Sequence, residues 1–250
     1  MLTTIIIANL IIGASIGISG IAGFMLPIIY TGLLGMPLVD ALALSFVSFL
    51  ASGLFGTYTY FRRGYIQKHV AGWLILASVI GSWAGVMLNM RVSVVLAKAL
   101  LYLIVLFAGF SLIRKKDGDE PQACPARRSG TLRLFLVSLP AAAVSSLTGA
   151  GGPIILVPTL CAFGTPIRSA VGLSLMASIF IALPAAAGYM ANATLDNIVL
   201  LAVVSFVTHS IGTLFGAHIS EMVNKKALRL LVATLAIGAS LYMLTVLLIF

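Results

Sequence analysis

The chain has 250 residues, of which 61% are hydrophobic and only 8% charged, with 15 Lys and Arg against 6 Asp and Glu. A soluble domain is about a quarter charged, so these counts exclude a soluble enzyme, a disordered chain and a nucleic-acid-binding protein. The formal net charge of +9 bears on orientation instead, because Lys and Arg gather in the cytoplasmic loops of membrane proteins. The composition predicts a membrane protein.

Long apolar runs, separated by short polar breaks, follow one another along the chain. They cover residues 2–19, 22–34, 37–61, 69–89, 92–113, 132–148, 152–163, 167–190, 198–218 and 227–250. The runs are too long and continuous for the strands of a membrane barrel, so we predict an all-α, polytopic membrane protein. Six of the runs have the roughly 20 residues that a helix needs to cross the bilayer alone.

The four shorter runs form two pairs, each joined by a glycine-rich break. The first break reads Ser-Gly-Ile-Ala-Gly over residues 19–23, and the second reads Thr-Gly-Ala-Gly-Gly-Pro over residues 148–153. We predict that each pair is a helical hairpin that turns back at its glycines.

These breaks belong to an internal repeat. The pattern Gly-x-Pro-x-x-x-Ala-x-x-Leu-Ser occurs at residues 35–45 and again, shifted by 129 positions, at residues 164–174. The same shift aligns Tyr60 with Tyr189, and a shift of 131 aligns Gly81-x-x-x-Gly85 with Gly212-x-x-x-Gly216. We therefore predict a first membrane repeat over 1–113, a linker over 114–131 and a second repeat over 132–250.

The basic residues indicate how the two repeats are oriented. If each broken pair crossed the bilayer once, six of the 15 Lys and Arg would lie outside; if each pair is a hairpin, only Arg91 and Lys98 do. The positive-inside rule favours the hairpins, which invert the second repeat relative to the first. We expect a multi-pass protein of the inner (cytoplasmic) membrane, with a cytoplasmic linker and both termini outside.

Inverted repeats with interrupted helices are typical of secondary transporters. A helix that begins inside the membrane presents unpaired N–H groups and a positive dipole end, which favour an anion. We expect the substrate to be bound by the two breaks and neighbouring hydroxyls: Ser19, Gly20, Ala22, Gly23, Ser45, Thr148, Gly149, Gly151, Gly152 and Ser174. The alternative is that these glycines only permit a kink or close helix crossing.

Two further features have competing explanations. We interpret Gly13-x-x-x-Gly17, Gly81-x-x-x-Gly85 and Gly212-x-x-x-Gly216 as packing grooves. His209 lies midway along a spanning run and is a candidate for proton coupling. The alternative is a neutral histidine that bonds Ser205 or Thr213 one turn away. We find no catalytic or metal-binding motif, so we expect neither an enzyme nor a bound cofactor or metal.

At the paired breaks the sequence resembles the sulfite exporter TauE/SafE family of membrane permeases. The resemblance is carried by Gly-Ile-Ser-Gly-Ile-Ala-Gly at 17–23 and Ser-Leu-Thr-Gly-Ala-Gly-Gly-Pro at 146–153, each followed by the Gly-x-Pro pattern. It extends over essentially the whole chain, although Ile21 and Ala22 depart from the usual run of three glycines. The family implies transport of sulfur-containing anions, coupled to an ion gradient.

We therefore predict a secondary transporter of small anions, such as sulfite, sulfoacetate or another organosulfonate, that works by alternating access. The expected partners are the anionic substrate and the lipid bilayer, with a proton or sodium ion as the candidate coupling ion and a homodimer as the candidate assembly. The alternatives are an anion channel and a non-transporting subunit of a membrane complex.

Overall fold

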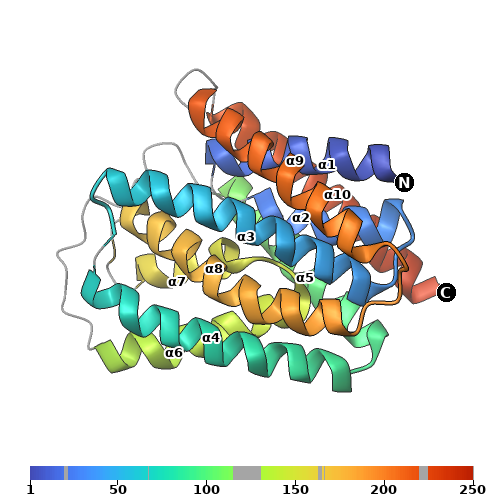
Figure 1. Cartoon of the computed structure of the whole chain (residues 1–250), viewed down its shortest axis with the longest axis horizontal. Helices are drawn as coiled ribbons and strands as arrows, with labels where there is room; N and C mark the ends of the chain where they lie inside the picture. Colours follow the sequence, from blue (N-terminus) through green and yellow to red (C-terminus); the bar gives the residue numbers. More distant parts are fainter. Residues whose placement is uncertain are drawn as a thin grey trace.

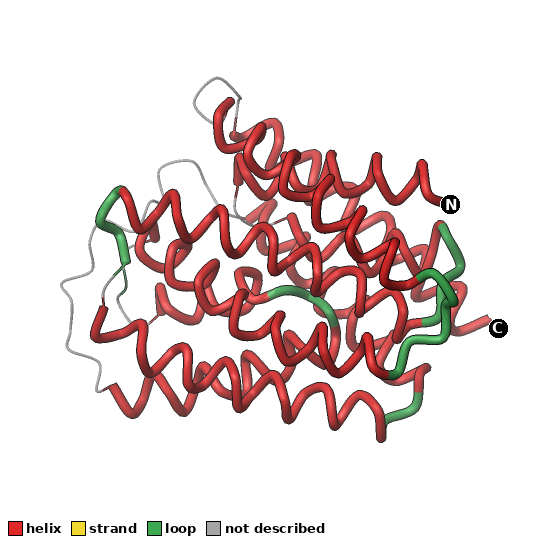
Figure 2. Tube along the Cα trace, viewed as in Figure 1, coloured by secondary structure: helices red, strands yellow, loops and turns green. Residues whose placement is uncertain are grey.

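The computed structural model describes residues 1–19, 22–66, 68–114, 131–162, 165, 167–219 and 225–249. These residues form helices joined by short connections, and no strand occurs among them (Figures 1 and 2). The linker predicted at 114–131 lies outside this description except for its end residues, and so does Gly20.

The helices follow the predicted apolar runs closely. They are α1 Leu2–Ser19, η1 Ala22–Phe24, α2 Met25–Ile28, η2 Ile29–Leu33, α3 Leu38–Arg62, α4 Lys68–Arg91, α5 Val94–Arg114, α6 Thr131–Thr148, α7 Gly152–Ala162, α8 Ile167–Ala191, α9 Ile198–Ile219 and α10 Lys225–Ile249. The difference lies at 22–34, where a 3₁₀ turn, a short α-helix and a π-helix replace one helix. Pro27 lies within this stretch and lacks the backbone N–H that a regular helix would use.

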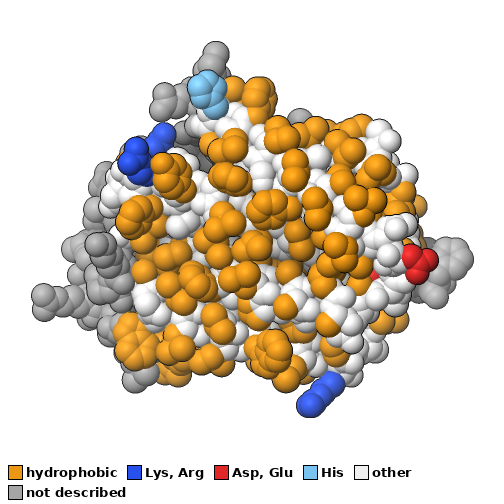
Figure 3. All heavy atoms as spheres, in the orientation of Figure 1, with side chains coloured by type: hydrophobic (Ala, Val, Ile, Leu, Met, Phe, Trp, Pro, Cys, Tyr) orange, Lys and Arg blue, Asp and Glu red, His pale blue; other side chains and the backbone are white. Residues whose placement is uncertain are grey.

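The outer surface agrees with membrane residence. Among the described residues, four segments are long and apolar enough to cross a bilayer: Leu38–Arg62, Val70–Arg91, Ser169–Ala191 and Ile198–Ile219. On the face shown in Figure 3, hydrophobic side chains cover the middle and charged side chains lie at the margins. The prediction of an all-α polytopic membrane protein is confirmed.

Helix pairs from the two halves of the chain pack together. At the centre, α3 packs along α8, and the two run in opposite directions (Figure 1). On one side α1 packs on α9, and on the other α6 packs on α4. Likewise, α3 contacts α9 as α8 contacts α4, and α5 packs with α10. Exchanging the two predicted repeats leaves this set of helix pairs unchanged.

Small residues bring α1 and α9 close together. A Cβ atom built on Gly13 would lie 2.6 Å from the carbonyl oxygen of His209, and one on Gly17 would overlap the backbone of α9. Gly212 and Gly216 face the α1 backbone in the same way. In α4, Gly81 and Gly85 pack against the backbone of α6. The prediction that these glycines form packing grooves is confirmed.

Candidate functional site

The second glycine-rich break lies in the interior of the protein. Helix α6 ends at Thr148 and α7 begins at Gly152, and the residues between them are all buried. Gly149 and Gly151 have φ angles of 73° and 81°, in the left-handed region that glycine adopts without strain. Gly149 and Gly151 lie three residues and one residue before the start of α7. Their conformation lets the chain turn back and begin a new helix inside the protein.

The carbonyl groups at the end of α6 accept hydrogen bonds from the chain that follows the helix and from neighbouring helices. The N–H of Gly149 donates to the carbonyl oxygen of Ser145 at 2.9 Å. The hydroxyl of Tyr189 donates to the carbonyl oxygen of Ser146 at 2.8 Å. The side-chain amide of Asn89 donates to the carbonyl oxygen of Leu147 at 2.6 Å. Helices α4 and α8 therefore hold the end of α6, which fixes where α7 begins.

A small cavity lies beside the start of α7. Its volume is about 20 Å³, and it is lined by Ile16, Gly23, Phe49, Ser52, Ala150, Gly151, Pro153, Ile154, Leu175 and Ser178. No lining residue is charged, so the polar groups at its wall are hydroxyls and backbone. The volume suffices for about one water molecule.

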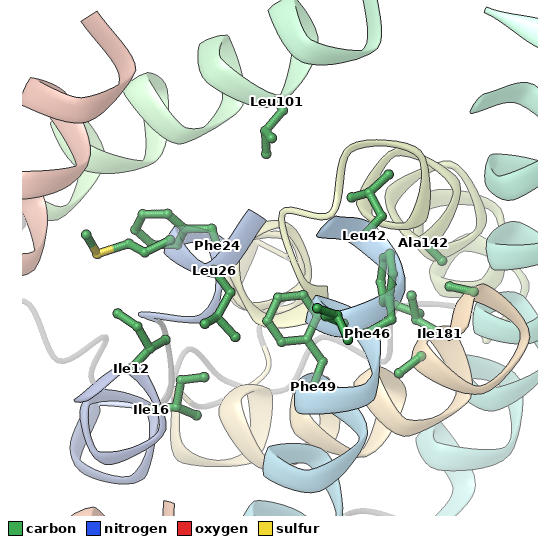
Figure 4. Packing of buried hydrophobic residues seen from close by; sticks show 14 of the residues in the cluster. Ile12, Ile16, Phe24, Leu26, Leu42, Phe46, Phe49, Leu101, Ala142 and Ile181 are labelled. Atoms are coloured by element: carbon green, nitrogen blue, oxygen red, sulfur yellow. The ribbon is translucent and has the colours of Figure 1, made fainter. Parts of the chain in front are cut away.

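The ring of Phe49 lies between the two breaks. A Cβ atom built on Gly23 would lie 2.9 Å from Cε1 of Phe49, and one on Gly151 would lie 3.7 Å from its Cε2. Figure 4 shows Phe49 extending from α3 toward Leu26 and Ile16. Phe46, one turn earlier, contacts Phe49 edge to face at 5.6 Å between ring centroids. Thus Phe49 contributes an apolar wall to which both breaks are adjacent.

Several predicted site residues lie at or beside this cavity. Gly23 and Gly151 line it, and a Cβ atom on Gly152 would lie 2.5 Å from Oγ of Ser178, which lines it too. Ala22 is buried next to Gly23 in η1. Thr148 and Gly149 are buried in the turn itself, Thr148 with its hydroxyl donating to the carbonyl oxygen of Val144 at 2.7 Å. The side chain of Ser19, like Gly20, lies outside the described part.

The two register-matched serines lie elsewhere. Ser45 donates to the carbonyl oxygen of Ala41 at 2.7 Å and Ser174 to that of Val171 at 2.9 Å, each within its own helix. Neither lines the cavity; Ser52 on α3 and Ser178 on α8 do, two turns and one turn further along. The sequence could show which serines share one face of each helix. It could not show which position along the helix lies level with the glycine-rich break.

His209 is fully buried on α9. The hydroxyl of Thr213 donates to the backbone carbonyl of His209 at 2.8 Å, not to its ring. Neither ring nitrogen has a hydrogen-bond partner among the described residues. The alternative that Ser205 or Thr213 satisfies the imidazole is therefore wrong, and a buried polar side chain without a partner requires an explanation.

A buried polar network, which sequence reasoning missed, joins α1, η2 and α3. The amide nitrogen of Asn9 donates to the hydroxyl of Tyr30 at 2.6 Å, and the hydroxyl of Ser48 donates to Oδ1 of Asn9 at 2.8 Å. All three side chains are fully buried. The signal in the sequence was the single asparagine of the largely apolar run 2–19.

A helix break in the interior of a multi-pass helical protein, beside a cavity, is typical of membrane transporters. The family model described as "Sulfite exporter TauE/SafE" matches residues 5–243, and the chain therefore belongs to this family. The "Probable membrane transporter protein YdhB" of Bacillus subtilis (strain 168) is 25% identical over 224 residues, which cover 86% of this chain and 87% of that protein. No solved structure matches the chain significantly. The protein is a membrane transporter and not an enzyme.

Proposed function

We propose that the protein is a secondary transporter that carries a small sulfur-containing anion, such as sulfite, sulfoacetate or another organosulfonate, by alternating access. The family is described as one of sulfite exporters. A central site made from the interior helix break would bind the anionic head.

The meeting of both breaks at one cavity carries this proposal. Gly23 comes from the first break and Gly151 from the second, although they are far apart in the chain. The first N–H groups of α7 have no carbonyl partner within the helix, and its dipole is positive at this end. Ser52 and Ser178 line the cavity. Their hydroxyls donate to carbonyl oxygens of their own helices, at 2.8 Å for Ser178 and 3.2 Å for Ser52, and would turn toward the anion to bind it. Neutral donors around a helix N-terminus bind an anion without a basic side chain.

The two breaks are not equivalent in this arrangement. The second is followed by the 11-residue helix α7, whereas the first is followed by a 3₁₀ turn of three residues and an α-helix of four. We assign the backbone donors mainly to α7 and give the first break a shaping role through Gly23.

The helix pairing supports inverted repeats over 1–113 and 132–250. The central helices α3 and α8 run in opposite directions, and the main contacts between the halves, such as α1 with α9 and α3 with α9, have counterparts in α6 with α4 and α8 with α4 when the halves are exchanged. Rocking of such repeats about a central site would expose it alternately to the two sides. The distribution of Lys and Arg supports a cytoplasmic linker over 114–131 and external termini.

Proton coupling is proposed at His209. Its imidazole is buried with no bonded partner among the described residues, so a proton gained there would change its interactions strongly. Sodium coupling is the second candidate and predicts transport that depends on sodium at constant pH.

Ligand binding by variants of the cavity serines tests the site. Sulfite, thiosulfate, sulfoacetate and taurine are screened by thermal shift in detergent, and the apparent affinity of the best ligand is compared among variants. Ser178→Ala and Ser52→Ala should each weaken binding about 5- to 10-fold, the effect of one hydrogen bond of roughly 1–1.5 kcal/mol. Ser174→Ala and Ser45→Ala, also buried and bonded to their own helices, serve as matched controls. Equal losses in all four variants would contradict this placement of the site.

Counterflow in proteoliposomes separates a transporter from an anion channel. A transporter that alternates should exchange internal for external labelled anion and saturate with concentration. Flux that rises without saturation and shows no exchange would favour the channel.

A further inference from the structure

A second cavity adjoins the first and extends toward one end of the molecule. Its volume is about 40 Å³, and it is lined by Ile16, Gly17, Phe55, Gly56, Thr59, Tyr60, Leu175, Thr213, Leu214 and Ala217. Ile16 and Leu175 also line the first cavity, so the two are neighbours. Thr59 and Tyr60 are in the last turn of α3, which ends at Arg62, and Ala217 is near the end of α9. The second cavity therefore leads from the break toward the end that carries Arg62 and Arg63, the cytoplasmic end in the proposed orientation.

On the other side of the break, the matching positions of the repeats line neither of the two cavities. The shifts that align the repeats pair Tyr60 with Tyr189, Gly17 with Ser146 and Thr213 with Ser82. Tyr189, Ser146 and Ser82 are fully buried, and none of them lines either cavity. In the first half Tyr60 is only half-buried; Thr213 is buried, at 2% exposed, but it lines the second cavity together with Gly17 and Tyr60.

Hydrogen bonds and stacking join these buried positions. The hydroxyl of Tyr189 donates to the carbonyl oxygen of Ser146 at 2.8 Å, and the hydroxyl of Ser146 donates to the carbonyl oxygen of Ser82 at 3.0 Å. The hydroxyl of Ser82 donates to the carbonyl oxygen of Ile181 at 2.6 Å. The ring of Tyr189 stacks on Phe46, with 5.7 Å between centroids and 8° between planes. Helices α4, α6 and α8 are thereby joined across the outer side of the break; we call Tyr189, Ser146 and Ser82 the outer clasp.

A sequence difference accounts for part of this asymmetry. Where the clasp has Ser146, whose hydroxyl bonds α4, the first half has Gly17, which has no side chain. A clasp of the same composition is therefore impossible on the inner side. The two halves of the protein therefore differ in the side chains that can join their helices at these matched positions.

We infer that the second cavity is the cytoplasmic half of the transport route and that Tyr189 is the gate residue that closes its outer half; this rests on the proposed function. The structure is the state closed to the outside. The first cavity, with room for one water molecule, is smaller than a sulfonate group. Substrate therefore enters only when the helices around Phe49 separate, and breaking the clasp opens the outer side.

Matched cysteines test this inference without any substrate. Cys124 and Cys161 are replaced by Ser, and Thr213→Cys or Ser82→Cys is introduced into that background. Ser146 bonds the backbone carbonyl of Ser82, so the Ser82→Cys change leaves that bond and the Tyr189 bond in place and removes only the bond from the Ser82 hydroxyl to Ile181. A membrane-impermeant thiol reagent is then applied to vesicles of both orientations. Both positions are buried, but Thr213 lines the second cavity and Ser82 lines neither cavity. Thr213→Cys should therefore react faster from the cytoplasmic side than Ser82→Cys reacts from either side.

Removing one hydroxyl should open the gate. Tyr189→Phe, which retains the ring and loses the bond to Ser146, should raise external labelling of Ser82→Cys about 2- to 10-fold, the population shift expected from one hydrogen bond. Labelling of Thr213→Cys from the cytoplasm should fall in parallel, which distinguishes a shift between states from unfolding. Ser146→Ala should act in the same direction, and Tyr60→Phe should not raise external labelling.

Two results would overturn the inference: equal labelling of the two cysteines, or unchanged protection of Ser82→Cys in both Tyr189→Phe and Ser146→Ala. Expected labelling without any anion binding would refute only the proposed function. Saturable anion binding together with equal labelling would refute only the gate.

Discussion

The carboxylate of Asp40 binds Thr194 twice: it accepts the backbone N–H at 2.8 Å and the side-chain hydroxyl at 2.7 Å. The backbone N–H of Leu195 lies 3.4 Å from the same carboxylate. Asp40 is in the first turn of α3 and Thr194 is in the connection from α8 to α9, so this contact joins the two halves of the chain. Asp40 is fully buried and Thr194 is exposed, so the contact is part-buried; it lies at the end of α3 opposite Arg62.

Loss of this tie should destabilise the protein. Asp40→Ala removes the acceptor of both Thr194 donors. Because Thr194 is exposed, these donors can bond water instead, so the free energy of unfolding should fall by about 1.5 kcal/mol, the lower end of the range for hydrogen bonds to a charged group. Denaturant unfolding in micelles measures the change. Asp196→Ala, at an exposed position of the same connection, is the control and should have little effect. Similar losses in the two variants would show that Asp40 has no special role.

Close crossing of α1 and α9 should tolerate no added methyl group. Gly17→Ala places a Cβ atom into the backbone of α9 at Thr213 and Ala217, so the helices must separate and folded yield should fall severely. Gly72→Ala in α4 is the matched control, because nothing lies within 4 Å of its Cβ position. That variant should be neutral or stabilising by up to about 1 kcal/mol through helix propensity. Size-exclusion profiles and thermal unfolding of the two proteins give the comparison, and a well-folded Gly17→Ala would contradict the crossing.

The Asn9 network should contribute to stability through groups that lose their partners. Asn9→Ala removes one partner of the Tyr30 hydroxyl and one partner of Ser48, which should cost about 1–3 kcal/mol. Ser48→Ala should cost less, because Asn9 retains its bonds to Tyr30 and to the carbonyl oxygen of Ile5 at 2.9 Å. Chemical unfolding should rank Asn9→Ala below Ser48→Ala, and the reverse order would show that Ser48 is the centre of the network.

His209→Gln should uncouple transport from a pH gradient. Glutamine cannot take up a proton, so accumulation of labelled anion driven by a pH gradient should disappear while counterflow at equal pH persists. His218→Gln, at an exposed position near the end of α9, should leave both activities unchanged. Gradient-driven accumulation by His209→Gln at the wild-type rate would exclude the histidine as the coupling group.

Much of the fold follows from local sequence. Runs of apolar residues predicted the helices to within a few residues, because only a helix satisfies its own backbone in lipid. The position of the second break was also predictable, since Gly149 and Gly151 take φ angles that other residues avoid. The stretch after the first break was not, because an interruption by 3₁₀ and π turns depends on what the segment packs against.

The candidate site shows the corresponding limit. Repeat register selected Ser45 and Ser174, and both bond their own helices. The cavity instead meets Ser52 and Ser178, on the same faces but at a different depth. That depth depends on how far α6 reaches into the protein. Hydrogen bonds from Asn89 on α4 and Tyr189 on α8 to the last carbonyl groups of α6 determine this reach.

The sequence by itself determined membrane residence, the helices, the glycine-rich break and the family, because hydropathy and glycine conformation are local properties. Tertiary structure decided which groups meet: Phe49 between two breaks, Asn9 with Tyr30, and Tyr189 on Ser146. It also decided that matched positions such as Tyr60 and Tyr189 have different surroundings. Local sequence is nearly the same at matched positions of the two repeats, so only the packing of whole helices can give those positions different surroundings.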